Sequence, residues 1–124
     1  MFDAYVFVSE LVKSAHSSIV LIDNYVDESV LVLLSKRKEG CSTIIYTKTI
    51  SKQMKLDLKK HNEQYAPIEI KLLKEAHDRF FIIDDRVVYH IGASLKDLGK
   101  KWFAFSKFDK EALVLLDKLE GVDL

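Results

Sequence analysis

The sequence predicts one α/β domain built on a mixed β-sheet, parallel in its first half and antiparallel in its second. Helical and strand-like segments alternate three times up to residue 72, which is typical of parallel strands joined by crossover helices. Two apolar runs then follow each other across a short polar turn, which is typical of an antiparallel hairpin. A length of 124 residues allows one sizeable core and is too short for two ordinary domains. We therefore expect residues 1–124 to form a single domain.

The strands of the first half are indicated by the order of their apolar residues. Short continuous apolar runs at 18–23 and 43–47 predict strands that are buried on both faces. Residues 68–72 alternate between apolar and charged side chains, as a half-exposed strand does. These three segments are the expected parallel strands.

The helices between them are indicated by periodicity and by capping residues. Apolar residues recur at helical spacing over 3–15, which predicts an amphipathic helix. Asp27 and Glu28 suit the start of a second helix, which Gly40 would end. Ser51 is the expected N-cap of a third helix that runs to about residue 61.

The second half has a different pattern. Residues 79–84 and 87–91 predict the two hairpin strands, with Asp85 in the turn. Residues 92–100 predict a loop or a single helical turn, 102–105 a further strand, and 112–119 a final helix.

Composition excludes several classes of protein. The 19 Lys and Arg residues balance the 19 Asp and Glu residues, so the overall charge does not favour general capture of polyanions. No apolar run approaches the roughly 20 residues of a membrane span. A single cysteine, Cys41, excludes an internal disulfide and a multi-cysteine zinc site, and it fits a reducing compartment. We expect a soluble, cytoplasmic protein.

Basic residues are nevertheless concentrated in two segments. Residues 36–60 contain eight basic and two acidic residues, and residues 96–107 contain four basic and one acidic residue. Folding can bring the two segments together into one basic patch. For the lysines of the third predicted helix, composition alone favours a solvated helix face over a binding surface; these are Lys52, Lys55, Lys59 and Lys60.

The candidate chemistry lies after residue 76. In an extended strand His77 and Arg79 project to the same side, and an imidazole beside a guanidinium suits a phosphodiester. The following loop adds a hydroxyl at Ser94 and an ammonium at Lys96. Spacing alone favours a less specific interpretation, in which His77 and Arg79 form ordinary polar pairs with carboxylates such as Asp78 or Asp84.

A family resemblance favours the phosphodiester interpretation over ordinary polar pairs. Residues 77–84, His-Asp-Arg-Phe-Phe-Ile-Ile-Asp, followed by Gly-Ala-Ser at 92–94, resemble the phospholipase D superfamily signature His-x-Lys-x4-Asp. Together with residues 95–102, they are most similar to the C-terminal phospholipase D-like domain of bacterial phage-antirepressor-like proteins, which carry a separate N-terminal DNA-binding domain. The resemblance implies a phospholipase D-like half-domain, excised from a longer chain, whose mixed sheet is covered by helices on both faces.

The resemblance also implies roles for individual residues. His77 matches the nucleophile that forms a phosphohistidine, Arg79 takes the place of the lysine, and Asp84 matches the aspartate of the motif. Phosphate would be bound by Arg79, Ser94, Lys96, Lys100 and Lys101. Because the chain has one motif, the second catalytic histidine would come from a homodimer partner across a twofold axis. Neither a metal nor a cofactor is implied.

Three departures from the signature weaken the case for catalysis. Arginine replaces lysine at residue 79, seven residues rather than six separate Asp84 from Gly92, and Leu95 or Lys96 occupies the region of the family asparagine. Binding an anion needs nearby positive donors, whereas in-line transfer needs them placed within about half an ångström. The remaining histidines, His16, His61 and His90, are predicted to be structural or surface residues.

We therefore expect a phosphodiester-binding domain whose partner is nucleic acid. One alternative is a homodimeric, metal-independent nuclease or phosphodiesterase with His77 as nucleophile. The other is a dimerisation or interaction module of a DNA-binding regulator.

Overall fold

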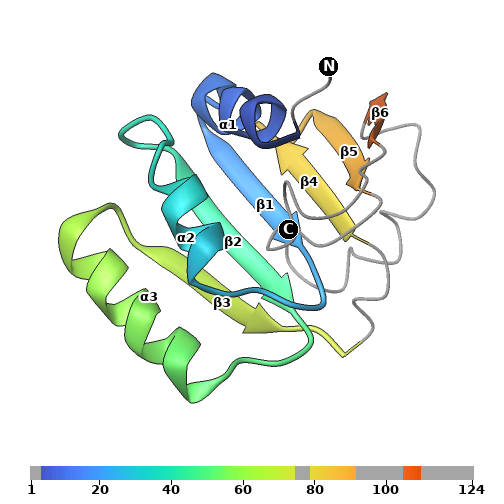
Figure 1. The fold of residues 1–124 in the computed structure, drawn as a ribbon. Coiled ribbons are helices and arrows are strands. Elements are labelled where there is room, and N and C mark those ends of the chain that lie inside the picture. Colours follow the sequence, from blue (N-terminus) through green and yellow to red (C-terminus); the bar gives the residue numbers. More distant parts are fainter. Residues whose placement is uncertain (1–3, 75–78, 92–104, 110–124) are drawn as a thin grey trace.

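The computed structural model describes residues 4–74, 79–91 and 105–109, and these form a mixed sheet flanked by helices (Figure 1). The elements in chain order are α1 (Ala4–Ser14), β1 (Ser18–Ile22), α2 (Glu28–Leu34), β2 (Ser42–Thr47), α3 (Lys52–Gln64), β3 (Ile68–Leu72), β4 (Arg79–Ile83), β5 (Val87–Ile91) and β6 (Phe105–Asp109). The predicted alternation of helices and strands is confirmed up to β3. The predicted loop at 92–100 and helix at 112–119 lie outside the described residues.

The sheet has the predicted mixed topology. Its strand order is β3-β2-β1-β4-β5-β6. β1 pairs in parallel with β2, and β2 in parallel with β3, whereas β4 runs antiparallel to both β1 and β5. The end of the sheet at which β1, β2 and β3 finish is called the carboxyl end below. β4 begins there, because it runs in the opposite direction.

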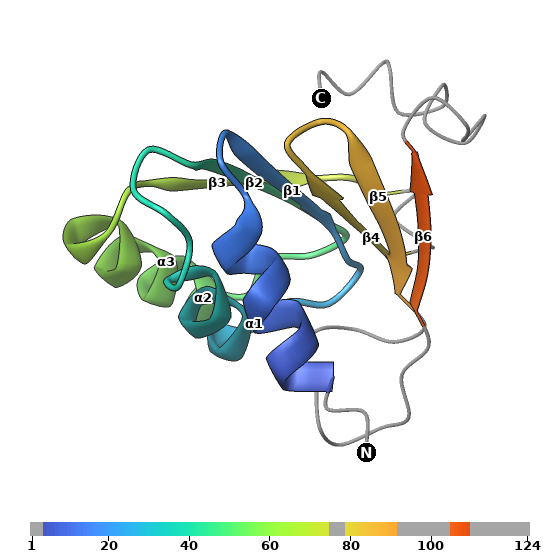
Figure 2. The ribbon, with the colours of Figure 1, turned by 90° about the horizontal axis from the view of Figure 1, so that it is seen from above.

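The three described helices lie on one face of the sheet, so helix cover of the opposite face stays a prediction (Figure 2). On that face α1 and α2 pack over a large buried cluster that includes Leu21 and Phe81. A second buried cluster, which includes Tyr46 and Phe80, lies on the opposite face. Burial on both faces explains why β1 and β4 each have four apolar residues out of five, and why β2 has Ile-Ile-Tyr at its centre.

Two element boundaries differ from those expected. α2 ends at Leu34 rather than near Gly40, because the main-chain N–H and the guanidinium of Arg37 both donate to the Leu34 carbonyl and close a tight turn. Gly40, at φ +83°, lies in the following turn before β2. The last strand begins at Phe105, the final residue of the expected run at 102–105, and continues to Asp109 in register with β5.

Candidate functional site at the carboxyl end of the sheet

Arg79 is brought next to the end of β1 by the strand register. It is the first residue of β4, and its neighbour Phe80 lies opposite Ile22, the last residue of β1. Side chains alternate along a strand, so Arg79 shares the helix-covered face with Phe81, and Asp23 shares it with Leu21. The antiparallel pairing therefore places a guanidinium beside the carboxylate that directly follows β1.

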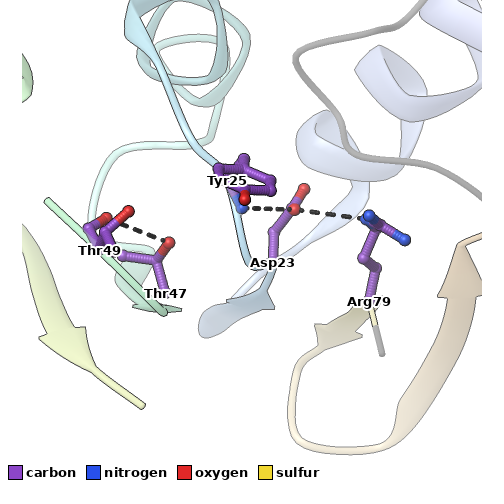
Figure 3. A network of polar contacts seen from close by, with 5 residues as sticks. All are labelled: Asp23, Tyr25, Thr47, Thr49 and Arg79. Carbon is purple, nitrogen blue, oxygen red and sulfur yellow. Dashed lines mark hydrogen bonds and ion pairs between the residues drawn. The ribbon is translucent and has the colours of Figure 1, made fainter. Parts of the chain in front are cut away.

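Asp23 and Arg79 form an ion pair at this end of the sheet (Figure 3). The distance from Asp23 Oδ1 to Arg79 Nε is 3.6 Å. The side chain of Asp23 is fully buried, whereas that of Arg79 remains 26% exposed. A buried carboxylate is costly unless it is paired and accepts hydrogen bonds. The pair therefore fixes the guanidinium at the surface by anchoring it to a buried charge.

Tyr25 is the exposed neighbour of this pair. Its main-chain N–H donates to the same Asp23 oxygen at 3.2 Å, and the residue is 55% exposed.

Thr47, at the end of β2, is buried, and its hydroxyl donates to the Thr49 carbonyl at 3.5 Å (Figure 3). The buried carboxylate of Asp23 thus binds both the Arg79 guanidinium and the main chain of the exposed Tyr25 where the parallel strands finish, which is the end of α/β sheets at which ligands bind.

The other predicted site residues have different positions. His77, Ser94, Lys96, Lys100 and Lys101 lie outside the described residues. Asp84 does not lie beside Arg79, because the length of β4, roughly 15 Å, separates the two ends of that strand. Among the described residues Arg79 forms an ion pair with Asp23. Asp78, which the less specific interpretation also named, lies outside the described residues.

Asp84 joins the hairpin turn to the start of β1. Its carboxylate accepts main-chain hydrogen bonds from His16, Ser17 and Ser18 at distances of 2.7 to 3.2 Å. Desolvation raises the pKa of Asp84, but the hydrogen bonds from Ser17, His16 and Ser18 together outweigh it and lower the pKa from 3.8 to about 2. Asp84 and Asp85 both have positive φ, 54° and 55°, as the central residues of a tight hairpin turn do.

We expect Asp84→Asn to lower the free energy of unfolding by about 1 to 2 kcal/mol at pH 7, after allowance for solvent screening. Because the pKa is lower in the folded state, this contribution is present above about pH 4 and disappears as the pH falls towards 2. Urea unfolding at several pH values measures it. Asp85→Asn, an exposed carboxylate in the same turn, is the control and should cost less. Equal losses from both variants would contradict the assigned contacts.

The three histidines predicted to be structural or surface residues have structural contacts. His90 packs its ring against Phe80, 5.1 Å between centroids, on the sheet face opposite to Arg79. The exposed His16 lies 3.3 Å from Lys38 Nζ. His61 is buried and stacks on Tyr65, and its Nε2 accepts from the Arg37 guanidinium at 3.2 Å. Burial, together with the charge of Arg37, lowers the pKa of His61.

This lowered pKa predicts acid sensitivity. Protonation of His61 favours the unfolded chain, so its contribution to stability is complete above pH 6.5 and falls at lower pH, by at most about 1.4 kcal/mol per pH unit. His61→Gln retains an acceptor for Arg37 and does not titrate. Urea unfolding at pH 7.5 and 5.5 should therefore show a smaller loss of stability in the variant than in the parent. The same loss in both would show that His61 does not carry the effect.

The described residues include neither a group of three or more histidine, cysteine, aspartate or glutamate residues suited to a metal ion nor a helix long and apolar enough to cross a membrane. Asp23 and Tyr25 were not predicted from the sequence to be site residues. The sequence does place the carboxylate of Asp23 immediately after a buried strand, which marks the end of that strand. It does not show that Arg79 is the residue with which this carboxylate pairs.

Comparison with known proteins shows a likeness in structure but none in sequence. No family model and no curated protein matches the sequence. Among solved structures, the chain is similar to NucT from Helicobacter pylori, with a TM-score of 0.63 and 17% sequence identity over 91% of this chain and 82% of that chain. The chain therefore shares the fold of NucT, and in this chain that fold is a mixed sheet with helices packed against it.

Proposed function

We propose that this domain binds a phosphodiester of nucleic acid through His77, Arg79 and the segment 94–101. The observation that carries the proposal is the anchored Arg79, a partly exposed guanidinium held by a buried carboxylate at the carboxyl end of the sheet. A guanidinium presents a planar set of donors that matches two phosphate oxygens. His77 precedes Arg79 by two residues, and the sequence pattern gives both the same side of an extended chain.

Binding of a labelled single-stranded oligonucleotide at two salt concentrations tests the proposal. Phosphate contacts release counterions, so affinity should fall steeply with salt. Arg79→Ala should weaken binding at least tenfold. Arg86→Ala, which removes an exposed arginine at the other end of the same hairpin, should change affinity less than about twofold. Absence of binding by the parent at low salt, or equal effects of the two variants, would refute the proposal.

A second variant distinguishes loss of binding from loss of folding. Arg79→Ala leaves Asp23 buried without its cation, which destabilises the fold. The combination Asp23→Asn with Arg79→Gln removes both charges together and retains hydrogen-bonding groups. It should remain folded and should still lose oligonucleotide affinity.

Tyr25 gives the site a preference for unpaired bases. Tyr25 is exposed, and its main chain is bonded to the carboxylate that holds Arg79, so its ring can stack on a base that is not enclosed in a duplex. We expect Tyr25→Ala to weaken single-strand binding about five- to a hundredfold and to leave binding of inorganic phosphate unchanged. Tyr25→Phe keeps the ring and is the matched control. Equal losses in both variants would exclude stacking.

A metal-independent nuclease is the second candidate, favoured by the fold shared with NucT and by His77 two residues before Arg79. In this proposal an imidazole nitrogen of His77 attacks phosphorus, the bond to the leaving oxygen breaks, and a second histidine protonates that oxygen. Water then cleaves the phosphohistidine. A homodimer would supply the second histidine, and sedimentation at high micromolar concentration tests for it.

We also propose that this domain belongs to a longer DNA-binding protein. The domain would be the C-terminal part of a phage-antirepressor-like protein, whose N-terminal domain binds DNA. This part rests on the sequence resemblance of residues 77–102 alone.

A further inference from the structure

Helix α3 carries four exposed lysines. Lys52, Lys55, Lys59 and Lys60 are all exposed, whereas Met54 and His61 on the opposite side of the helix are buried. Lys52, Lys55 and Lys59 are three and four residues apart, so they form one continuous row over two turns of the helix. We call these four residues the lysine face. Figure 1 shows α3 beside β3 at the margin of the sheet, away from the hairpin of β4 and β5.

Among the described residues, no acidic side chain forms an ion pair with the lysine face. Within residues 4–74 and 79–91, the ion pairs join Lys13 to Glu10, Lys71 to Glu69 and Arg79 to Asp23, and none involves the lysine face. Asp57, on the same helix, accepts a hydrogen bond from Gln53 at 3.0 Å instead. Opposite charges three or four residues apart on a helix attract each other, and such pairs would have offset the charge of the lysines.

Glu63 is the acidic residue of α3 that is best spaced to pair with the lysine face. It follows Lys59 by four residues and Lys60 by three, and it forms an ion pair with neither. The positive charge of α3 is therefore presented outward, where it attracts an anionic partner.

We propose that the lysine face is a second contact surface for the backbone of a nucleic acid whose phosphodiester is held at Arg79. The proposal rests on the proposed function, which supplies the class of partner. α3 begins after β2, and therefore starts at the carboxyl end of the sheet, where the pair of Asp23 and Arg79 lies (Figure 1). A single strand that leaves Arg79 along this end reaches Lys52 first and then follows the helix to Lys59, a rise of about 10 Å.

The apolar residues of α3 argue for nucleic acid rather than a membrane surface. A helix that lies on a membrane exposes a wide apolar face to the acyl chains. In α3 that face is used inside the protein, because Met54 is buried and Leu58 packs against the core. Leu56, 57% exposed, is the one large apolar side chain of α3 that is exposed among the described residues. A row of ammonium groups with one exposed apolar neighbour is suited to the phosphates of a nucleic-acid backbone, and it lacks the apolar surface needed to contact the acyl chains of a membrane.

The test compares two triple variants with the same loss of charge. The first is Lys52→Gln, Lys55→Gln and Lys59→Gln, in which glutamine preserves helix propensity. The control is Lys13→Gln, Lys36→Gln and Lys38→Gln, three exposed lysines outside α3. The ligands are a single strand of about sixteen nucleotides, the upper end of a typical single-strand site, and a dinucleotide that reports on the Arg79 end alone.

We expect the α3 variant to bind the long strand about ten- to a hundredfold more weakly at low salt. The slope of log affinity against log salt should decrease by about 2, because three phosphate contacts are lost. The control variant should keep the parent's slope. The α3 variant should bind the dinucleotide as the parent does, which shows that the Arg79 end is intact.

The remaining outcomes separate the two proposals. Equal slopes for the α3 variant and the control would overturn the lysine face while leaving the Arg79 site standing. Binding that depends on the lysine face but not on Arg79 would support the lysine face as a nucleic-acid surface and refute the proposed function at Arg79. Loss of binding to phosphatidylserine vesicles in the α3 variant, with unchanged oligonucleotide binding, would overturn the proposal in favour of a membrane surface.

Discussion

Asp23→Ala should lower the free energy of unfolding by about 2 to 4 kcal/mol, a large effect for a single polar residue. The substitution removes a fully buried carboxylate that pairs with Arg79 and accepts the Tyr25 N–H. Breaking a buried ion pair from one side costs roughly 3 to 5 kcal/mol, and the partial exposure of Arg79 puts this pair towards the low end.

Urea unfolding measures the loss, and an exposed pair provides the control. Glu69 lies 3.9 Å from Lys71 in an ion pair whose side chains are 66% and 43% exposed, so Glu69→Ala should cost less than about 1 kcal/mol. A double-mutant cycle with Arg79→Ala isolates the coupling of Asp23 to Arg79. Strictly additive losses would show that the two residues do not stabilise each other.

Comparison of His77→Ala with Arg79→Ala should separate a binding domain from an enzyme. We expect Arg79→Ala to weaken binding at least tenfold and His77→Ala to weaken it only slightly. A guanidinium is always charged, whereas an imidazole with an ordinary pKa of about 6.5 is mostly neutral at pH 7. The measurements are oligonucleotide affinity and hydrolysis of a generic phosphodiester in the presence of a chelator.

The nuclease alternative predicts the reverse order for turnover. Removal of the nucleophile closes the covalent route, so His77→Ala would abolish metal-independent hydrolysis while most of the binding persists. Turnover by the parent that disappears in His77→Ala, together with a trapped phosphohistidine, would establish the enzyme and overturn the non-catalytic proposal.

Much of the fold was predictable because each strand carries a local signal. The apolar runs of β1 and β2, the alternation of β3 and the N-cap at Ser51 are properties of neighbouring residues, and the structure confirms them. The end of α2 was not predictable in the same way. It depends on the Arg37 side chain turning back to the Leu34 carbonyl, whereas a glycine six residues later is the stronger sequence signal.

The candidate site was only half predictable for a similar reason. The motif identified Arg79 from its own sequence neighbours, and the structure sets it at a strand end. Its partner Asp23 lies far away in the sequence and becomes adjacent only through the register of β1 with β4. Asp84 belongs to the same motif as Arg79, yet a full strand length carries it to the other end of the sheet. Its assignment as a catalytic residue stays a prediction.

Nuclear magnetic resonance of the Arg79 side chain tests the central claim most directly. The Nε–H of Arg79, next to Asp23 Oδ1, should give a resonance that can be assigned by its loss in Arg79→Lys. Titration with a dinucleotide should shift this resonance, with the same dissociation constant as the main-chain amide of Tyr25. Saturable binding that leaves the Arg79 and Tyr25 resonances unchanged would show that the phosphodiester binds elsewhere and would contradict the account.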